Sequence, residues 1–329
     1  MRRNISEETS VLTYSNNLQR KFVAGRFTPI VLLCASLCMW VGALFITTAP
    51  VTGAALFGYE WLSVVAVLLC FVAAAALLGS FTLFERRVRW LPALFLWLAS
   101  LSLFLHGHVA IAFSVLLMVV IVAQLFRCQV AGNQERMLYA LFLAVGTATL
   151  LSPAFLLLSP LFVVASSAGS SLGAKKLLAM LLGFVTPFWL LFGTTYVFPS
   201  LDFLIESFLM TVKEVFVVDF FSFSLFRVVM LLVELSVLLP SVAIFVGSSL
   251  PGKPLHRRRL VFIYSFYVYL LLLSFVFDGY ELFYALRLPW LAIMASYLFV
   301  FKINRLSNIY FIILNIAWLA IAPICVWLI

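Results

Sequence analysis

Long apolar runs separated by short polar loops make up almost the whole chain. Most of the runs are about 20 residues long, the length that an α-helix needs to cross a hydrocarbon core of about 30 Å. The run at 90–126 is too long for one such helix and contains His106-Gly107-His108, so we expect two helices, at 90–105 and 109–126. The other long runs predict spans at 29–47, 61–84, 177–198, 223–247, 260–277, 284–301 and 308–329.

Residues 137–166 admit two interpretations, one long tilted helix or two short helices that meet at Ser152-Pro153. The loops on both sides are basic, and Lys and Arg concentrate in short cytoplasmic loops, so both loops belong on one side of the membrane. Pro153 and Pro160 also favour short, broken helices over a continuous one. We therefore expect a broken hairpin at 137–166. The basic residues of the two loops are Arg127, Arg136, Lys175 and Lys176.

The fold class predicted by this pattern is all-α, a polytopic transmembrane protein with about 11 spans. Residues 1–28 are polar and predict a cytoplasmic tail, either unfolded or with a short helix on the anionic inner leaflet. Residues 29–329 form a single transmembrane domain. Within it, 201–221 predicts an amphipathic helix in the outer interface, because its charged side chains share one face. Those side chains are Asp202, Glu206 and Lys213.

Composition and charge support a membrane protein and orient it. The chain is 65% hydrophobic and 10% charged, whereas soluble domains are about 25% charged. The net charge of +9 would suggest nucleic acid in a soluble protein, but here it marks the cytoplasmic side, and no nucleic-acid partner is expected. With the N-terminus cytoplasmic and the C-terminus periplasmic, all but three of the 21 Lys and Arg residues fall on the inner side. The three exceptions are Lys213, Arg227 and Arg287.

Two ionisable residues, Glu234 and Arg227, stand inside the predicted span 223–247. They lie two turns apart on one helix face, about 10 Å, which is too far for a direct ion pair. An intramembrane carboxylate indicates either a proton or ion site or a bundle-facing group held by neighbouring hydroxyls. The first interpretation predicts a proton- or ion-coupled transporter, which is one hypothesis for the protein.

The predicted outer face collects His106, His108 and seven of the 12 acidic residues. Carboxylates beside histidines can perform acid–base chemistry, although an interfacial turn accounts equally for His-x-His, and no third ligand stands at a metal-site spacing. No nucleotide-binding loop, dinucleotide fingerprint, zinc-protease motif or serine elbow occurs in the chain, and no cofactor is evident. The acidic residues are Glu60, Asp202, Glu206, Glu214, Asp219, Asp278 and Glu281.

A pattern over 85–200 resembles the membrane core of GT-C glycosyltransferases, and in length and hairpin it resembles a family of Bacteroidota inner-membrane proteins. A basic loop leads to LFLAVGTATLLSPAFLLLSPLFVVAS, then to a lysine-containing loop, then to LLAMLLGFVTPFWLLFG. GT-C enzymes transfer sugars from polyprenyl-phosphate carriers at the outer face. The resemblance implies an inner-membrane protein of the bacterial envelope that handles a lipid-linked glycan or lipid, as an enzyme or an accessory subunit.

The resemblance also assigns roles to particular residues. Glu60 takes the place of the acidic residue of the first outer loop, with Asp202 or Glu206 as further catalytic candidates. Arg287, His106 and His108 are the candidates for binding the substrate or a lipid phosphate, Arg287 because the fork of its guanidinium matches phosphate oxygens. The first outer loop is short here, and no large outer domain follows the last span. Lipids and other membrane proteins are therefore the expected partners, and a non-catalytic structural subunit of an envelope complex is the third hypothesis.

Overall fold

The computed structural model describes most of the chain, with gaps at the N-terminus and in several loops. The described residues are 19, 25, 27–47, 59–81, 90–102, 105–106, 108–129, 134–167, 173–198, 200, 202–217, 225–247, 254–277, 279–301 and 305–328. Side chains are described for all of these residues except 43–47, 59–62, 204, 214–215, 225–226, 254, 301, 305–306 and 321–328.

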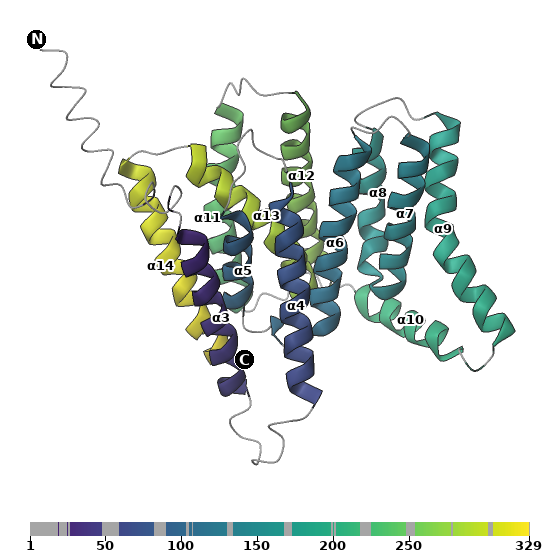
Figure 1. Cartoon of the computed structure of the whole chain (residues 1–329), viewed down its shortest axis with the longest axis horizontal. Coiled ribbons are helices and arrows are strands. Elements are labelled where there is room, and N and C mark those ends of the chain that lie inside the picture. Colours follow the sequence, from purple (N-terminus) through teal and green to yellow (C-terminus); the bar gives the residue numbers. More distant parts are fainter. Residues whose placement is uncertain are drawn as a thin grey trace, which may run out of the picture.

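Helices alone make up the regular structure of the described ranges, which confirms the all-α class (Figure 1). Their ends lie within a few residues of most of the boundaries expected from the apolar runs. The helices are α3 Thr28–Thr47, α4 Tyr59–Gly79, α5 Leu91–Leu101, α6 Val109–Cys128, α7 Gln134–Leu151, α8 Ala154–Ser167, α9 Ala174–Val197, α10 Asp202–Val215, α11 Leu225–Gly247, α12 Pro254–Val276, α13 Tyr280–Phe301 and α14 Arg305–Leu328.

Within the described residues, 5 helices are long enough and apolar enough to cross a membrane: α6, α9, α11, α12 and α13. Shorter apolar stretches lie in α3, α4, α5, α8 and α14. The protein is thus a helical, apolar protein of the kind embedded in membranes. The expectation of about 11 crossings stays a prediction.

The interpretation of 137–166 as a broken hairpin agrees with the structure, in which α7 and α8 pack side by side (Figure 1). The turn is Ser152-Pro153, where the Ser152 N–H donates to the Ala148 carbonyl and closes the end of α7. A second proline, Pro160, lies inside α8 and leaves the Leu156 carbonyl without its helical donor. The hydroxyl of Ser159 donates to that carbonyl at 2.8 Å, so α8 continues through the proline.

Helix α5 is shorter than the predicted 90–105, because it ends at Leu101 and is about 16 Å long. Ten of its 11 residues are buried, and α3, α4, α13 and α14 surround it. The buried Ser102 that follows α5 shows that the helix ends inside the bundle rather than at its surface. An apolar run therefore predicted the position of α5 correctly and its length incorrectly.

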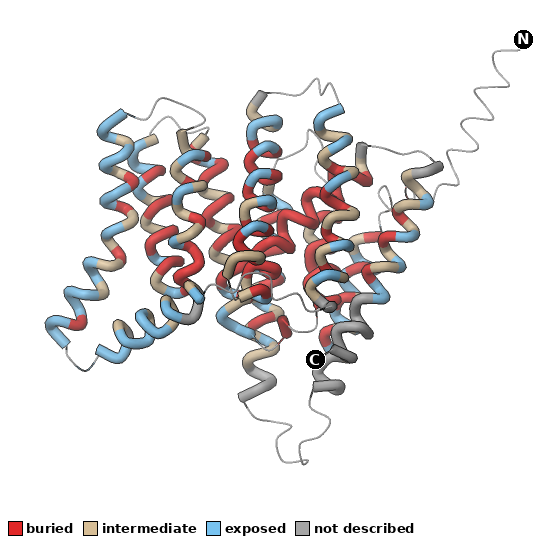
Figure 2. Tube along the Cα trace, turned by 180° about the vertical axis from the view of Figure 1, so that it is seen from behind, coloured by how far each residue is buried: buried red, intermediate tan, exposed pale blue. Residues whose placement is uncertain are grey.

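Helix α13 is the centre of the bundle. In its most apolar stretch of 18 residues, 94% of the residues are buried, and α5, α6, α11 and α12 pack around it. The buried residues concentrate there in Figure 2. Helix α9 is the opposite case, because only 17% of the residues in its most apolar stretch are buried. Its exposed side chains are almost all apolar, as expected of a helix that faces lipid.

Two glycines bring α7 and α9 into backbone contact. A Cβ built on Gly183 would lie 2.4 Å from the Tyr139 carbonyl oxygen, and one on Gly146 would lie 2.5 Å from the Phe184 carbonyl oxygen. Neither position has room for a side chain, and small residues are what allow helices in a membrane to approach this closely. Pro187 also touches the Gly146 position, so Gly183, Phe184 and Pro187 of the GFVTP sequence form the α9 side of this contact.

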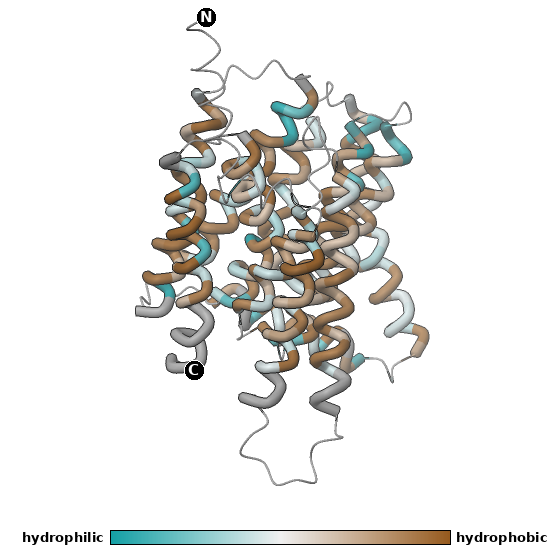
Figure 3. Tube along the Cα trace, turned by 60° about the vertical axis from the view of Figure 1, so that its left-hand side comes forward, coloured by the Kyte–Doolittle hydropathy of each residue, from teal (hydrophilic) through white to brown (hydrophobic). Residues whose placement is uncertain are grey.

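Basic helix ends and the acidic helix lie at opposite ends of the bundle. The basic starts of α9 and α12 lie at the upper end in Figure 1, where hydrophilic residues also gather in Figure 3. The acidic helix α10 lies at the lower end (Figure 1). Gln19 of the N-terminal tail is tied to the upper end, because its side chain donates to the Phe299 carbonyl and its N–H donates to Asn308, both at 2.8 Å.

Candidate functional site

A buried ion pair joins the centre of α11 to the central helix α13. Arg287 Nη2 lies 3.2 Å from Glu234 Oε1, and the two side chains are 2% and 3% exposed. Arg287 is seven residues into α13, which places it about 10 Å from the start of that helix. Both charges are therefore held inside the bundle, where an unpaired charge would be very costly.

Helix α12 supplies a hydroxyl to each member of the pair. The Tyr267 hydroxyl donates to Glu234 Oε2 at 2.8 Å, and Arg287 Nη1 donates to the Ser274 hydroxyl at 2.7 Å. Among the described residues, Arg287 Nε has no hydrogen-bond partner, and neither has Glu234 Oε1 beyond its ionic contact with the guanidinium. The pair is thus well oriented but not fully satisfied.

Aromatic rings surround the guanidinium on the side toward the start of α13. Its carbon lies 5.8 Å from the ring centroids of both Tyr280 and Tyr284. Arg227, at the start of α11, stands 5.3 Å from the ring centroid of the same Tyr280. Cation–π attraction stabilises such contacts by about 0.5–2 kcal/mol. The half-buried Arg227, the ring of Tyr280 and the buried Arg287 thus form a series that runs from the helix ends into the bundle.

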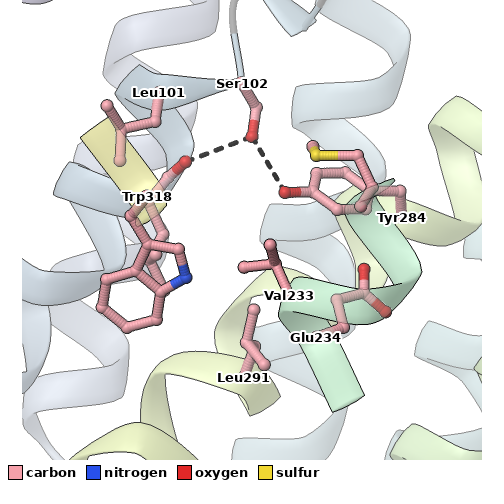
Figure 4. A pocket seen from close by; sticks show the side chains of 9 residues that line it. Leu101, Ser102, Val233, Glu234, Tyr284, Leu291 and Trp318 are labelled. Atoms are coloured by element: carbon pink, nitrogen blue, oxygen red, sulfur yellow. Dashed lines mark hydrogen bonds between the residues drawn. The ribbon is translucent and has the colours of Figure 1, made fainter. Parts of the chain in front are cut away.

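A small cavity lies against Glu234 (Figure 4). The cavity has a volume of about 20 Å³, which is enough for one water molecule. Polar groups reach it from α13 and from the end of α5, where the Ser102 hydroxyl donates to the Tyr284 hydroxyl at 3.2 Å. Trp318 of α14 closes another wall. The carboxylate thus has a polar space beside it that holds room for water.

Both helices that carry the pair contain a proline, Pro240 in α11 and Pro289 in α13. Pro240 removes the N–H that would bond the Ser236 carbonyl. The hydroxyl of Tyr310 on α14 donates to that carbonyl instead. Next to Pro240, Ser241 donates to the Met294 carbonyl of α13 at 3.2 Å, so α11 is joined to α13 two turns beyond Glu234 as well. Helices α13 and α14 therefore stabilise the interrupted helix α11 beside the site.

The structure corrects the predicted position of Arg287. The spacing of Glu234 and Arg227 already argued against an ion pair between them, and the partner of Glu234 is instead Arg287. Arg287 was expected near the outer surface, as a ligand for a lipid phosphate. It is 2% exposed and its guanidinium is engaged by Glu234 and Ser274. The tertiary structure thus moves Arg287 from the surface to the interior.

The two histidines have different environments. His106 is buried and stacks on Trp40, with 3.6 Å between ring centroids. Burial lowers the pKa of His106 to about 4, against the effect of the Ala99 and Ser100 backbone, so its imidazole is neutral near pH 7. His108 is exposed, and its Nε2 lies 3.7 Å from Glu281 Oε2. Only His108 is accessible to a ligand from outside.

The carboxylates named as catalytic candidates are not gathered around Arg287. Asp202 and Glu206 are exposed on α10, which packs on α9 at the far end of the molecule from α11 and α13 (Figure 1). Glu60 belongs to the first turn of α4, and its side chain lies outside the described ones. No group of three or more metal-ligating side chains occurs in the part of the chain that the structure describes.

The signal for the pair was present in the sequence but incomplete. Arg287 lies in an apolar helix that begins after the acidic Asp278-Gly279-Tyr280-Glu281 loop. It was counted with the residues of the outer side, because the predicted span began at 284 and Arg287 is only three residues from that start. The helix begins four residues earlier, at Tyr280.

Comparison with known proteins gives no family for the chain. No family model matches it, and neither a curated protein nor a solved structure does.

Proposed function

We propose that the protein is a multi-pass transporter of the bacterial inner membrane that couples substrate movement to a proton, with Glu234 as the group that carries the proton. The observation that supports this proposal is the buried Glu234–Arg287 pair. Ionisable residues at membrane depth are rare, and they mark proton relays and ion or substrate pathways. A well-packed apolar pair is often as stable as a buried ion pair or more stable, so stability alone gives little reason for these charges.

Two features of the surroundings favour a site that exchanges protons and rearranges. The cavity has room for a water that bridges Glu234 to the hydroxyls of Tyr284 and Ser102. The prolines in α11 and α13 interrupt the two helices that carry the charges, and interrupted helices are common around transport sites. A proton on Glu234 removes the charge that holds Arg287, and this change can drive a rearrangement of the two helices.

The orientation belongs to the same proposal. The basic starts of α9 and α12 lie at one end of the bundle, and short cytoplasmic loops are rich in Lys and Arg. We place this end in the cytoplasm, together with the N-terminus, and the C-terminus in the periplasm. The start of α13, with Tyr280 and the nearby Arg227, then faces the periplasm.

Glu234→Gln is expected to abolish proton-coupled transport, because Gln retains the oxygen that accepts from Tyr267 but cannot take up or release a proton. Purified protein is reconstituted into liposomes that contain a pH-sensitive dye. Succinate, inorganic phosphate, choline, lysine, glucose and serine are then added separately under an inward proton gradient. At least one of them should accelerate internal acidification in the wild type, and Glu234→Gln should lower that rate at least tenfold.

Glu281→Gln is the matched control, because Glu281 is exposed in the first turn of the same helix α13. This substitution is expected to leave the rate unchanged. If no compound from any charge class moves protons, or if Glu234→Gln transports like the wild type, the transporter proposal fails. A structural role in an envelope complex is then the better account.

A second proposal keeps the GT-C-like relationship, in which the protein handles a lipid-linked glycan or lipid of the envelope as an enzyme or accessory subunit. Its support is the α7–α8 hairpin with its turn at Ser152-Pro153, and the tight contact that Gly183 and Pro187 make with α7. These elements carry the sequence resemblance. The acidic helix α10 lies at the end of the bundle where a periplasmic substrate would be met.

The catalytic form of this second proposal predicts that Glu60→Ala, or the pair Asp202→Ala and Glu206→Ala, reproduces the change in lipid-linked sugars caused by deleting the protein. Lipid-linked sugars are measured by mass spectrometry of membrane extracts from each strain. Lys213→Ala, a charge change on α10 itself, serves as the control. If deletion alters these lipids and the acidic variants do not, the protein acts as an accessory subunit rather than as the enzyme.

A further inference from the structure

The buried pair has features that define the chemical class of its substrate, an inference that rests on the proposed transport function. When Glu234 takes up a proton, Arg287 keeps its charge, because a guanidinium does not release its proton in proteins. Among the described residues, the remaining contacts of the guanidinium are neutral, the Ser274 hydroxyl and the rings of Tyr280 and Tyr284. A buried cation with only neutral contacts is strongly destabilised, so the protonated state needs another negative group at Arg287.

We infer that the site binds a small oxyanion, a carboxylate or phosphate group that takes the place of the Glu234 carboxylate on Arg287 when Glu234 is protonated. The planar guanidinium has donors in a fork that matches two oxygens of such a group. In the structure its Nε has no hydrogen-bond partner among the described residues, and only Nη2 contacts Glu234. An entering oxyanion can engage the idle Nε together with Nη2.

Charge balances in this exchange. Before it, the pair holds one negative and one positive charge. Afterwards a neutral Glu234 acid stands beside Arg287 and one bound monoanion, so the charge inside the bundle does not change. One proton and one monoanion therefore enter together, and neither is buried without a partner. This is the cheapest way to carry an anion through an apolar interior, where an uncompensated charge costs several kcal/mol.

The space around the pair supports exchange rather than simple addition. The cavity beside Glu234 holds about one water, so an anion does not fit next to an intact pair. It fits only when the Glu234 side chain gives up its position. At the start of α13, the ring of Tyr280 lies near both Arg227 and Arg287. Arg227, half-buried at the start of α11, is placed to attract an anion toward this side of the pair.

Protonation of Glu234 is the one titration that this exchange requires. Among the described residues, the other titratable groups around Glu234 are Arg287, Tyr280 and Tyr284 from α13, Tyr267 from α12, and Arg227 from α11 itself. Arginine and tyrosine side chains titrate at about pH 10 or above. The end of α5 and helix α14 contribute Ser102 and Trp318, whose side chains do not titrate between pH 5.5 and pH 8. Anion binding should therefore be stronger at low pH.

The test measures binding by thermal unfolding of the full-length protein in phosphatidylcholine nanodiscs at pH 5.5 and pH 8, with ionic strength matched by sodium chloride. The probes are succinate and inorganic phosphate, with choline and glucose for comparison. Each affinity is expressed per monoanion, because succinate and phosphate themselves lose a proton between these pH values. At least one anion should bind the wild type at least tenfold more tightly at pH 5.5. Glu234→Gln, which imitates the protonated acid, should bind that monoanion equally well at both pH values.

The double variant Glu234→Gln/Arg287→Met separates binding from folding, because it contains neither charge and is expected to fold. It should show no anion effect. A second set of nanodiscs with added phosphatidylglycerol distinguishes sources: stabilisation of Glu234→Gln by that lipid alone assigns the oxyanion to a lipid headgroup. The inference is overturned if Glu234→Gln binds no anion at pH 8, or if the double variant binds as Glu234→Gln does. Proton movement driven only by choline, lysine, glucose or serine would overturn it and leave the transporter proposal standing.

Discussion

Arg287→Met destabilises the protein by about 3–5 kcal/mol, while the double variant Glu234→Gln/Arg287→Met regains at least half of that loss. The single substitution leaves the Glu234 carboxylate buried with Tyr267 as its one remaining polar contact. Removing one partner of a buried pair has a cost of this size, whereas replacing both is often nearly neutral. The measurement is the unfolding free energy of each variant in detergent micelles, arranged as a double-mutant cycle.

Arg227→Met is the matched control for this cycle. It also removes a guanidinium from the ring of Tyr280, but from a half-buried position. Its expected cost is about 1 kcal/mol, the size of a cation–π contact. If the double variant is as unstable as Arg287→Met alone, the charges of Glu234 and Arg287 are not coupled in the folded protein, and the proposed site loses its basis.

Gly183→Leu separates α7 from α9 and destabilises the protein by several kcal/mol. Even a Cβ at this position would lie 2.4 Å from the Tyr139 carbonyl and 3.1 Å from the Leu143 nitrogen, and backbone atoms inside a helix have little freedom to move. Overpacking in a tight interior typically costs about 1–3 kcal/mol, and here it also breaks the contact between two helices. Thermal unfolding and protease sensitivity of the loop between α8 and α9 are the measurements.

Gly193→Leu is the control for this prediction, because Gly193 is on the same helix α9 and nothing lies within 4 Å of its Cβ position. It changes helix propensity and hydrophobicity in the same way as Gly183→Leu, so it isolates the effect of the contact. Equal losses in the two variants would show that the α7–α9 contact contributes little. Gly146→Leu should behave like Gly183→Leu, since it faces α9 from the other side.

The helices were predictable because their signals are local. Apolar runs, loop charges and prolines indicated most of them to within a few residues, and the turn at Ser152-Pro153 was placed correctly. Helix α5 was predicted too long, since an apolar sequence continues past Leu101 while the helix does not. Nothing local distinguishes an apolar helix from the apolar connection that follows it when both are buried.

The candidate site was predictable only in part. Glu234 was recognised because a carboxylate inside an apolar run is unusual. Its partner was missed, because Arg287 lies 53 residues away and the start of its helix was placed four residues late. For the histidines and acidic residues of the predicted outer face, the sequence did not indicate how far apart their side chains lie. Among the described ones, only His108 and Glu281 contact each other.

By itself the sequence determined the class of the protein, because membrane helices must be long, apolar and internally hydrogen-bonded, and each of these demands leaves a pattern along the chain. It also determined which loops are basic and where the hairpin turns. Only the tertiary structure decided that Arg287 is buried, that it meets Glu234, and that Gly146 and Gly183 bring two helices into contact. Those facts depend on which helix faces lie against each other. That choice is made by packing among many apolar surfaces of similar hydrophobicity, and no single stretch of the chain specifies it.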